Sequence, residues 1–159
     1  MKRWMTALLL PLLLLTGCTR SISRTDAPLE TFSFSHTGMS TDQIFGYRVY
    51  RSGGQYLADF DLFCRFEVQG VVLDEADAAA LRQLIEDANL WQWNGFAGRN
   101  NHVLDGEGFG LTVTFRDGTT LSAHGSNAFP KGYGEGAGAI TRYFQALMDK
   151  HGIDPCPDE

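Results

Sequence analysis

Apolar residues alternate with polar ones from Phe45 to Val68, and this alternation constrains the fold more than any other feature of the sequence. A period of two is typical of a β-strand with one buried face. The pair Gly53-Gly54 interrupts the pattern and predicts a two-residue hairpin turn. That turn predicts three facing pairs whose side chains share the buried face: Val49 with Ala58, Tyr47 with Phe60 and Phe45 with Leu62.

The second strand of this hairpin is expected to continue without a break to Val68, because Cys64 and Phe66 keep the same period. The opposite face would be charged, with Arg48 lying across from Asp59. The other charged residues expected there are Asp61, Arg65 and Glu67.

Two amphipathic helices are predicted further along the chain. Asp74 is expected to cap the first, with Glu75 and Asp77 in a first turn that favours acidic side chains, and Asn89 can end it. Each helix has one apolar stripe at helical spacing. The stripes are Leu81, Leu84, Ile85 and Ala88 in the first helix, and Ile140, Tyr143, Phe144, Leu147 and Met148 in the second.

A second hairpin is predicted between residues 109 and 124, where apolar positions again alternate. A two-residue loop at Asp117-Gly118 would turn Leu121 to the wrong face. A three-residue loop, Arg116-Asp117-Gly118 with the glycine in the left-handed conformation, avoids this. It pairs Val113 with Leu121, and Leu111 with Ala123.

A short strand at Phe32 and Phe34 completes the element order β-β-β-α-β-β-α. The helical stripes need an apolar sheet face to cover. The predicted fold class is therefore α+β: a five-stranded, mainly antiparallel sheet with two helices packed on one face. The other sheet face would be polar and open to solvent.

The first seventeen residues have the parts of a bacterial export signal. Lys2 and Arg3 precede an apolar run of about twelve residues, shorter than the roughly 20 that a helix needs to cross a bilayer. The run ends in Leu15-Thr16-Gly17-Cys18, which resembles the lipobox of bacterial lipoproteins. The resemblance implies cleavage before Cys18, acyl chains such as palmitate on that cysteine, and stable attachment to a membrane. Thr19, where an aspartate would favour the inner membrane, implies the outer membrane facing the periplasm in a Gram-negative host.

The expected organisation is a signal peptide at residues 1–17, a lipidated flexible tether at 18–30 and a single domain at 31–159. Loss of Lys2 and Arg3 leaves 11 of the 13 basic residues against 19 acidic ones, so the net charge falls from −6 to −8. A strongly acidic domain argues against nucleic acid as a partner. After lipidation of Cys18, Cys64 and Cys156 form an even pair in an oxidising compartment, and a disulfide between them is expected.

The densest aromatic cluster, residues 91–96, supports two interpretations. Exposed Trp91 and Trp93 could bind sugar rings of peptidoglycan by stacking. Large aromatic side chains mostly pack inside proteins, however, so the rings are rather expected to fill the end of the sheet where the first helix leaves it.

The loop from Ser52 to Tyr56, Ser-Gly-Gly-Gln-Tyr, resembles the Ser-Gly-x-x-Tyr loop of the membrane-bound C-type lysozyme inhibitors, which are also small lipoproteins. The resemblance implies that Ser52 and Tyr56 are binding residues in a loop that enters the lysozyme cleft. This chain departs from that family in its two long helix patterns and its cysteine spacing. The residues themselves favour a plain hairpin turn.

A hydrolase would need a nucleophile with a base in hydrogen-bond reach. His124 and Ser126 supply the residue types, with His124 expected on the open face opposite Gly110, and His102, Asp105 and Asn127 are further polar candidates. No Gly-x-Ser-x-Gly elbow accompanies them, and Asp105 and Asn127 are ordinary turn residues.

No metal or cofactor is expected. His36, His102, His124 and His151 are widely spaced and form no metal-ligand motif. The stretch 134–139 matches Gly-x-Gly-x-x-Ala but does not directly follow a strand, so it is interpreted as a flexible start of the last helix rather than a dinucleotide loop.

The segment from Trp91 to Tyr133 resembles small bacterial lipoproteins of unknown function, and this resemblance implies no activity. The sequence therefore favours a non-catalytic envelope lipoprotein that binds a protein or cell-wall partner. The alternatives are a hydrolase using His124 and Ser126, and a lysozyme-inhibitor-like protein acting through the Ser52–Tyr56 hairpin.

Overall fold

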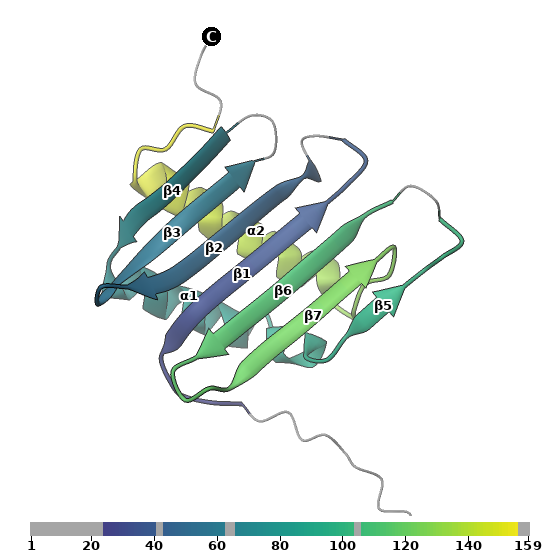
Figure 1. Ribbon diagram of the computed structural model, residues 1–159, viewed down its shortest axis with the longest axis horizontal. Coiled ribbons are helices and arrows are strands. Elements are labelled where there is room, and N and C mark those ends of the chain that lie inside the picture. The colour runs from purple at the N-terminus through teal and green to yellow at the C-terminus, as the bar shows by residue number, and fades with distance from the viewer. Residues whose placement is uncertain (1–23, 41–42, 63–65, 104–105, 156–159) are drawn as a thin grey trace, which may run out of the picture.

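The computed structural model describes residues 24–40, 43–62, 66–103 and 106–155, which form one sheet covered on one side by helices (Figure 1). The sheet has seven strands in the order β4-β3-β2-β1-β6-β7-β5. These strands are β1 (Leu29–Thr37), β2 (Phe45–Ser52), β3 (Gln55–Leu62), β4 (Phe66–Leu73), β5 (Ala97–Arg99), β6 (Gly108–Phe115) and β7 (Thr120–Ser126). The helices are α1 (Glu75–Asp87), the 3-10 helix η2 (Leu90–Trp93) and α2 (Tyr133–Lys150). The predicted α+β class is confirmed, with a mainly antiparallel sheet and α1 and α2 on one face.

Both hairpin registers are confirmed. In the first hairpin Val49 pairs with Ala58, and Gly53 and Gly54 turn the chain at φ 59° and 88°. In the second, Val113 pairs with Leu121 around the three-residue loop, whose Gly118 has φ 83°. β1 lies between the two hairpins and pairs antiparallel with β2 and β6.

The expected uninterrupted strand up to Val68 is wrong. β3 ends at Leu62, and β4 begins at Phe66 and runs back beside it, with these two positions paired. The paired residues Leu62 and Phe66 are four positions apart in the sequence. Because four is an even number, the alternation of apolar and polar residues stays in phase from β3 to β4. The alternation therefore could not reveal the reversal.

The sheet also gains β5, which pairs parallel with β7 through only three residues. A strand this short shows no readable alternation. Together with the split of the long strand, β5 raises the predicted five strands to the observed seven.

The start of α1 is confirmed as a capped helix. The Asp74 carboxylate accepts a hydrogen bond from the Asp77 backbone N–H at 2.8 Å, and the Asp77 carboxylate accepts one from the Asp74 N–H at 3.2 Å. This reciprocal arrangement satisfies two N–H groups that the helix leaves unpaired. α1 ends at Asp87, and Asn89 follows in the left-handed conformation at φ 49°.

The core lies between the sheet and the two helices. Phe144 of α2 is at its centre, with its ring 4.4 Å from the Tyr47 ring and nearly parallel to it. Phe32 and Phe60 also contact Phe144, at centroid distances of 5.8 and 5.9 Å. The even-numbered apolar residues of β1 and the odd-numbered residues of β6 therefore face the helices, as the alternation of apolar and polar residues predicted.

The domain begins earlier than the predicted boundary at residue 31. Leu29 is the first residue of β1 and is buried, and the segment before it contacts the domain. Arg24 donates a hydrogen bond to the Asn89 side chain at 3.0 Å, and the Thr25 hydroxyl donates one to Asp117 at 2.5 Å. The last residues assigned to the tether are therefore bound to α1 and to the β6–β7 loop, because their polar side chains find partners there.

Candidate functional site

The helices leave one face of the sheet uncovered (Figure 1). The exposed strand positions on that face are mostly polar. They alternate with the buried ones, so the face presents the side chains that the core excludes. Nine of them in β1, β6 and β7 are hydroxyl residues: Thr31, Ser33, Ser35, Thr37, Thr112, Thr114, Thr120, Ser122 and Ser126. We refer to this surface as the open face.

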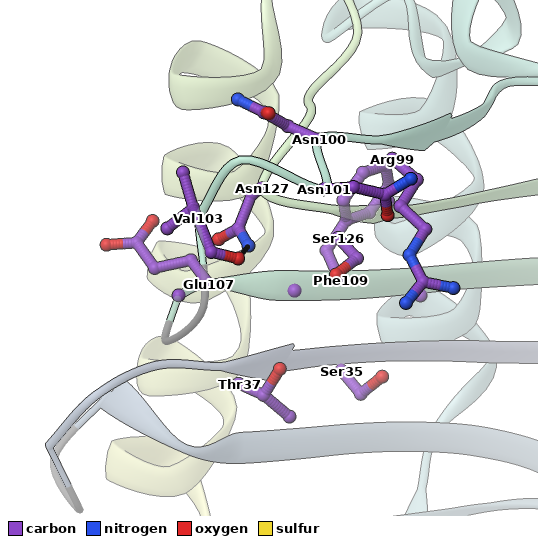
Figure 2. Close-up of a pocket in the computed structure, with 14 residues that line it drawn as sticks. Ser35, Thr37, Arg99, Asn100, Asn101, Val103, Glu107, Phe109, Ser126 and Asn127 are labelled. Carbon is purple, nitrogen blue, oxygen red and sulfur yellow. Dashed lines mark hydrogen bonds between the residues drawn. The ribbon is translucent and has the colours of Figure 1, made fainter.

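A cleft of about 900 Å³ is sunk into one end of the open face. Ser35 and Thr37 of β1 form one wall, and Ser126 of β7 lies on the other side of β6 (Figure 2). Arg99 extends from β5 over the same hollow, and the following loop adds Asn101 (Figure 2). The Glu107 carboxylate also lines the cleft (Figure 2). The cleft thus combines hydroxyl, amide, guanidinium and carboxylate groups that can bind a polar ligand.

Glycines form the floor of the cleft. A Cβ atom on Gly108 would lie 2.7 Å from the Thr37 hydroxyl oxygen, and one on Gly110 would lie 3.1 Å from the Ser35 oxygen. The hydroxyl groups of β1 therefore reach over positions that only glycine can occupy without displacement. Glycine inside a strand weakens it, and it often marks a place where another molecule approaches the backbone.

A second hollow of about 240 Å³ lies beside the cleft on the same face, above Gly46 of β2. Ser35 lines both hollows. The charged and amide groups that line the second hollow are Arg48, Asp59, Asp61, Glu67 and Gln69.

The charges of the open face are poorly neutralised. Asp61 and Glu67 occupy facing positions of β3 and β4, and neither has an ion pair within the described part of the chain. Arg48 lies across from Asp59, as predicted, but its guanidinium lies 4.6 Å from the centre of the Tyr50 ring and makes no ion pair with a described residue. Like charges in facing positions destabilise a sheet.

The predicted pair His124 and Ser126 is exposed on the open face, and His124 pairs with Gly110 as expected. Ser126 lines the cleft, whereas His124 does not. Among the described residues no hydrogen bond joins the two side chains. His102 is exposed in the loop after β5, and Asp105 lies outside the described residues.

The indole rings of Trp91 and Trp93 are both fully buried, so neither presents a face to a sugar. Trp91 stacks on Phe115 at 5.2 Å and donates a hydrogen bond to Glu86 at 2.7 Å. The interpretation that these two residues stack on peptidoglycan is therefore wrong. The other interpretation, that they pack at the end of α1, agrees with the structure.

The hairpin at Ser52–Tyr56 does not present the tyrosine that the lysozyme-inhibitor resemblance implies. Tyr56 is 3% exposed, and its hydroxyl donates a hydrogen bond to the Leu29 carbonyl at 2.8 Å. Ser52 and the two glycines are exposed. The alternation that makes Tyr56 part of the buried face overrides the five-residue match.

The histidines occupy separate surroundings. Nδ1 of His36 lies 2.9 Å from the Tyr133 hydroxyl, and burial lowers the pKa of the His36 imidazole. Nε2 of His151 lies 3.9 Å from the Asp77 carboxylate. In the described ranges no three His, Cys, Asp or Glu side chains gather as a metal site would require. The Gly-x-Gly-x-x-Ala stretch forms the first turns of α2.

Other predicted residues also lie outside the described part of the chain, namely Cys18 with its lipobox, Cys64, Arg65 and Cys156. No helix within the described ranges is both long and apolar enough to span a membrane. Comparison with known protein families and with curated proteins yields no match to this chain.

Sequence reasoning missed Arg99, Asn101 and the glycine floor. Arg99 belongs to a strand too short to show a period, and Asn101 belongs to a loop. The available signal was the pair Gly108 and Gly110, which fills consecutive open-face positions of β6 on either side of buried Phe109.

Proposed function

We propose that this protein is a lipid-anchored protein of the bacterial cell envelope whose domain binds a protein or cell-wall partner without catalysis. The observation that carries the proposal is the cleft of about 900 Å³ on the open face, with its glycine floor and with Arg99, which forms no ion pair with a described residue. Glycines in two consecutive open positions of a central strand weaken the sheet, and the close approach of the Thr37 and Ser35 hydroxyl groups accounts for part of their presence. The same missing side chains leave the floor of the cleft open to a ligand.

The position of the cleft supports an anchored binding domain. β1 enters the domain at Leu29, on the side where the N-terminal segment arrives, and Ser35 and Thr37 lie near its other end (Figure 1). At about 3.3 Å per residue, the cleft is roughly 20–26 Å from that entrance. Lipid on Cys18 would therefore leave the cleft directed away from the membrane surface.

A hydrolase is the second candidate function, because Ser126 lines the cleft. A serine nucleophile needs a base within about 3.2 Å. His124 is two residues away on the same strand, which separates the two Cα atoms by roughly 6.8 Å. A binding role requires no such contact and is therefore favoured.

Site-specific photocrosslinking in intact cells tests the proposal. A photoreactive residue at Asn101, in the cleft, is expected to capture a discrete partner or cell-wall fragment. The matched control is Gln145, which is exposed on α2 on the other side of the molecule. Equal capture from both positions, or none from Asn101 but a discrete product from Gln145, would contradict binding at the open face.

The catalytic alternative is tested with Ser126→Ala and His124→Ala in the same cells. Under the binding proposal, each variant complements a deletion of the protein as well as the parent protein does. Failure of either variant to complement the deletion, at an unchanged melting temperature, would favour the hydrolase.

A further inference from the structure

The two hollows of the open face form one trough that crosses the strands. In the paired register Asp61, Gly46, Ser35 and Gly110 follow one another across β3, β2, β1 and β6. Two of these four positions are glycines, so no side chain rises above the backbone at Gly46 and Gly110. Ser35 belongs to both hollows and links them. On β7 the next position of this row is the exposed His124, which does not line the cleft. The trough passes beside His124, over Ser126, which pairs with Arg99 of β5 in the register.

The two ends of this trough carry opposite charges. Asp61 and Glu67 face each other at the β3–β4 end, and Arg99 lies at the β5 end. All three lack an ion pair within the described ranges. The facing carboxylates cost stability, and no cation of the described ranges forms an ion pair with them. A ligand with a cation at one end and an anion at the other would neutralise both ends.

The distance between the two charged ends of the trough sets the length of a ligand that can reach both. From β3 to β5 there are five interstrand spacings, which at about 4.8 Å each give roughly 24 Å. An extended peptide advances about 3.3–3.6 Å per residue, so about seven residues would reach from end to end. Ser33, Ser35 and Thr37 lie along the middle, where their hydroxyl groups can donate to peptide carbonyls and accept from N–H groups.

We infer that the trough binds an extended peptide of about seven residues, with an ammonium group at Asp61 and Glu67 and a carboxylate at Arg99. This inference rests on the proposed function, because it names the ligand class of the same face. Exposed ion pairs are individually weak, so the two ends set the direction of the peptide more than its affinity.

Isothermal titration of the purified mature protein with a synthetic heptapeptide of alanine, serine and glycine tests the inference. The peptide is used with free ends, with an acetylated N-terminus and with an amidated C-terminus. Each block is expected to weaken binding about two- to fivefold at low salt, and less at high salt. Failure of the free peptide to bind at millimolar concentration would overturn the inference.

Two variants of the protein test which end of the trough binds which end of the peptide. Arg99→Gln should abolish the effect of amidation and keep that of acetylation, whereas the double variant Asp61→Asn, Glu67→Gln should do the reverse. Unchanged effects of both blocks in these variants would overturn the assignment. If the peptide does not bind while Asn101 still captures a partner in cells, the peptide inference fails and the open-face proposal stands.

Gly46→Val provides a blocked trough in a folded protein. A Cβ at this position has its nearest neighbour at 3.7 Å, on Asp61, so the backbone can accept a side chain there. The variant should lose peptide binding at an unchanged or raised melting temperature. The control is Ser122→Val, which adds the same side chain on the open face away from both hollows and should bind normally. Equal affinity of both variants would contradict the trough.

Discussion

Nζ of Lys150 lies 2.7 Å from Oδ1 of Asp77 and joins the last turn of α2 to the first turn of α1. The same ammonium group lies 2.9 Å from the Asp74 carboxylate, which caps α1. One side chain thus links the two helices that cover the sheet, and it does so at the helix ends whose partial charges suit these groups.

The first prediction removes this link. Lys150→Met keeps the length of the side chain but not its charge, and we expect a melting temperature lower by a few degrees because Asp77 is nearly buried and loses its cation. Thermal unfolding followed by circular dichroism measures the change. Lys131→Met, at an exposed lysine without an ion pair among the described residues, is the control and should unfold like the parent protein. Equal melting temperatures of all three proteins would contradict the link.

The second prediction concerns acid. The hydrogen bond from Lys150 lowers the pKa of Asp74, and the hydrogen bond from Thr25 lowers the pKa of Asp117. Burial raises the pKa of Glu86, but hydrogen bonds from Trp91 and Arg82 outweigh it, so the net shift is downward.

Because these three pKa values are lower in the folded chain, the folded state binds fewer protons than the unfolded one. Their contribution to stability is complete above the unfolded pKa values, near 4 to 4.5, and is lost as the pH falls through the folded values. Urea unfolding should therefore show a lower midpoint at pH 3 than at pH 6. Thr25→Val should reduce this difference, since it removes the donor to Asp117. A midpoint that does not change with pH would contradict the prediction.

The hairpin registers could be predicted from the sequence because each fixes a whole buried face. A slip of one residue at Gly118 would have turned Leu121 to the open face while Val113 stayed buried, and the three-residue loop avoids that. The reversal of direction between β3 and β4 could not be predicted, because Leu62 and Phe66 are an even number of positions apart and the alternation stays in phase.

The candidate site was harder to predict than the core for a related reason. Burial imposes a pattern on apolar residues, whereas the cleft depends on missing side chains at Gly108 and Gly110 and on one charge from a three-residue strand. Tyr56 shows the converse, since a match to a functional loop gave way to the burial of its ring.

The third prediction concerns the lipid. Cys18→Ala should abolish incorporation of radioactive palmitate and leave the uncleaved precursor, because the lipobox resemblance implies that the acyl chain is attached through the thiol of that residue. Gel electrophoresis of labelled cells measures both effects. Cys64→Ala is the control and should remain labelled. Label retained by the Cys18→Ala protein would contradict the lipobox.

The fourth prediction concerns the other two cysteines. A disulfide between Cys64 and Cys156 would close a loop of 92 residues, for which chain entropy gives an upper figure of about 4.6 kcal/mol. Alkylation of the denatured, unreduced mature protein, followed by mass spectrometry, should modify neither thiol, and alkylation after reduction should modify both. Two modified thiols without reduction would end the hypothesis.

The fifth prediction compares two glycines in the first turns of α2. A Cβ on Gly134 would meet no atom within 4 Å, whereas one on Gly136 would lie 2.5 Å from Cζ2 of Trp93 and 2.9 Å from Cδ2 of Leu90. The Trp93 ring cannot give way easily, because it is fully buried and packed against Phe109 and Tyr133.

The same substitution should therefore have opposite effects at these two positions. Gly134→Ala should stabilise the protein by about 0.5–1 kcal/mol, since alanine favours a helix and restricts the unfolded chain. Gly136→Ala should destabilise it by about 1–3 kcal/mol through overpacking. Urea unfolding measures both free energies. Trp93→Phe makes room for the added methyl group, so the double variant should cost less than the sum of the two single substitutions. Stabilisation by Gly136→Ala, or strict additivity in the double variant, would contradict the packing of Trp93 against this turn of α2.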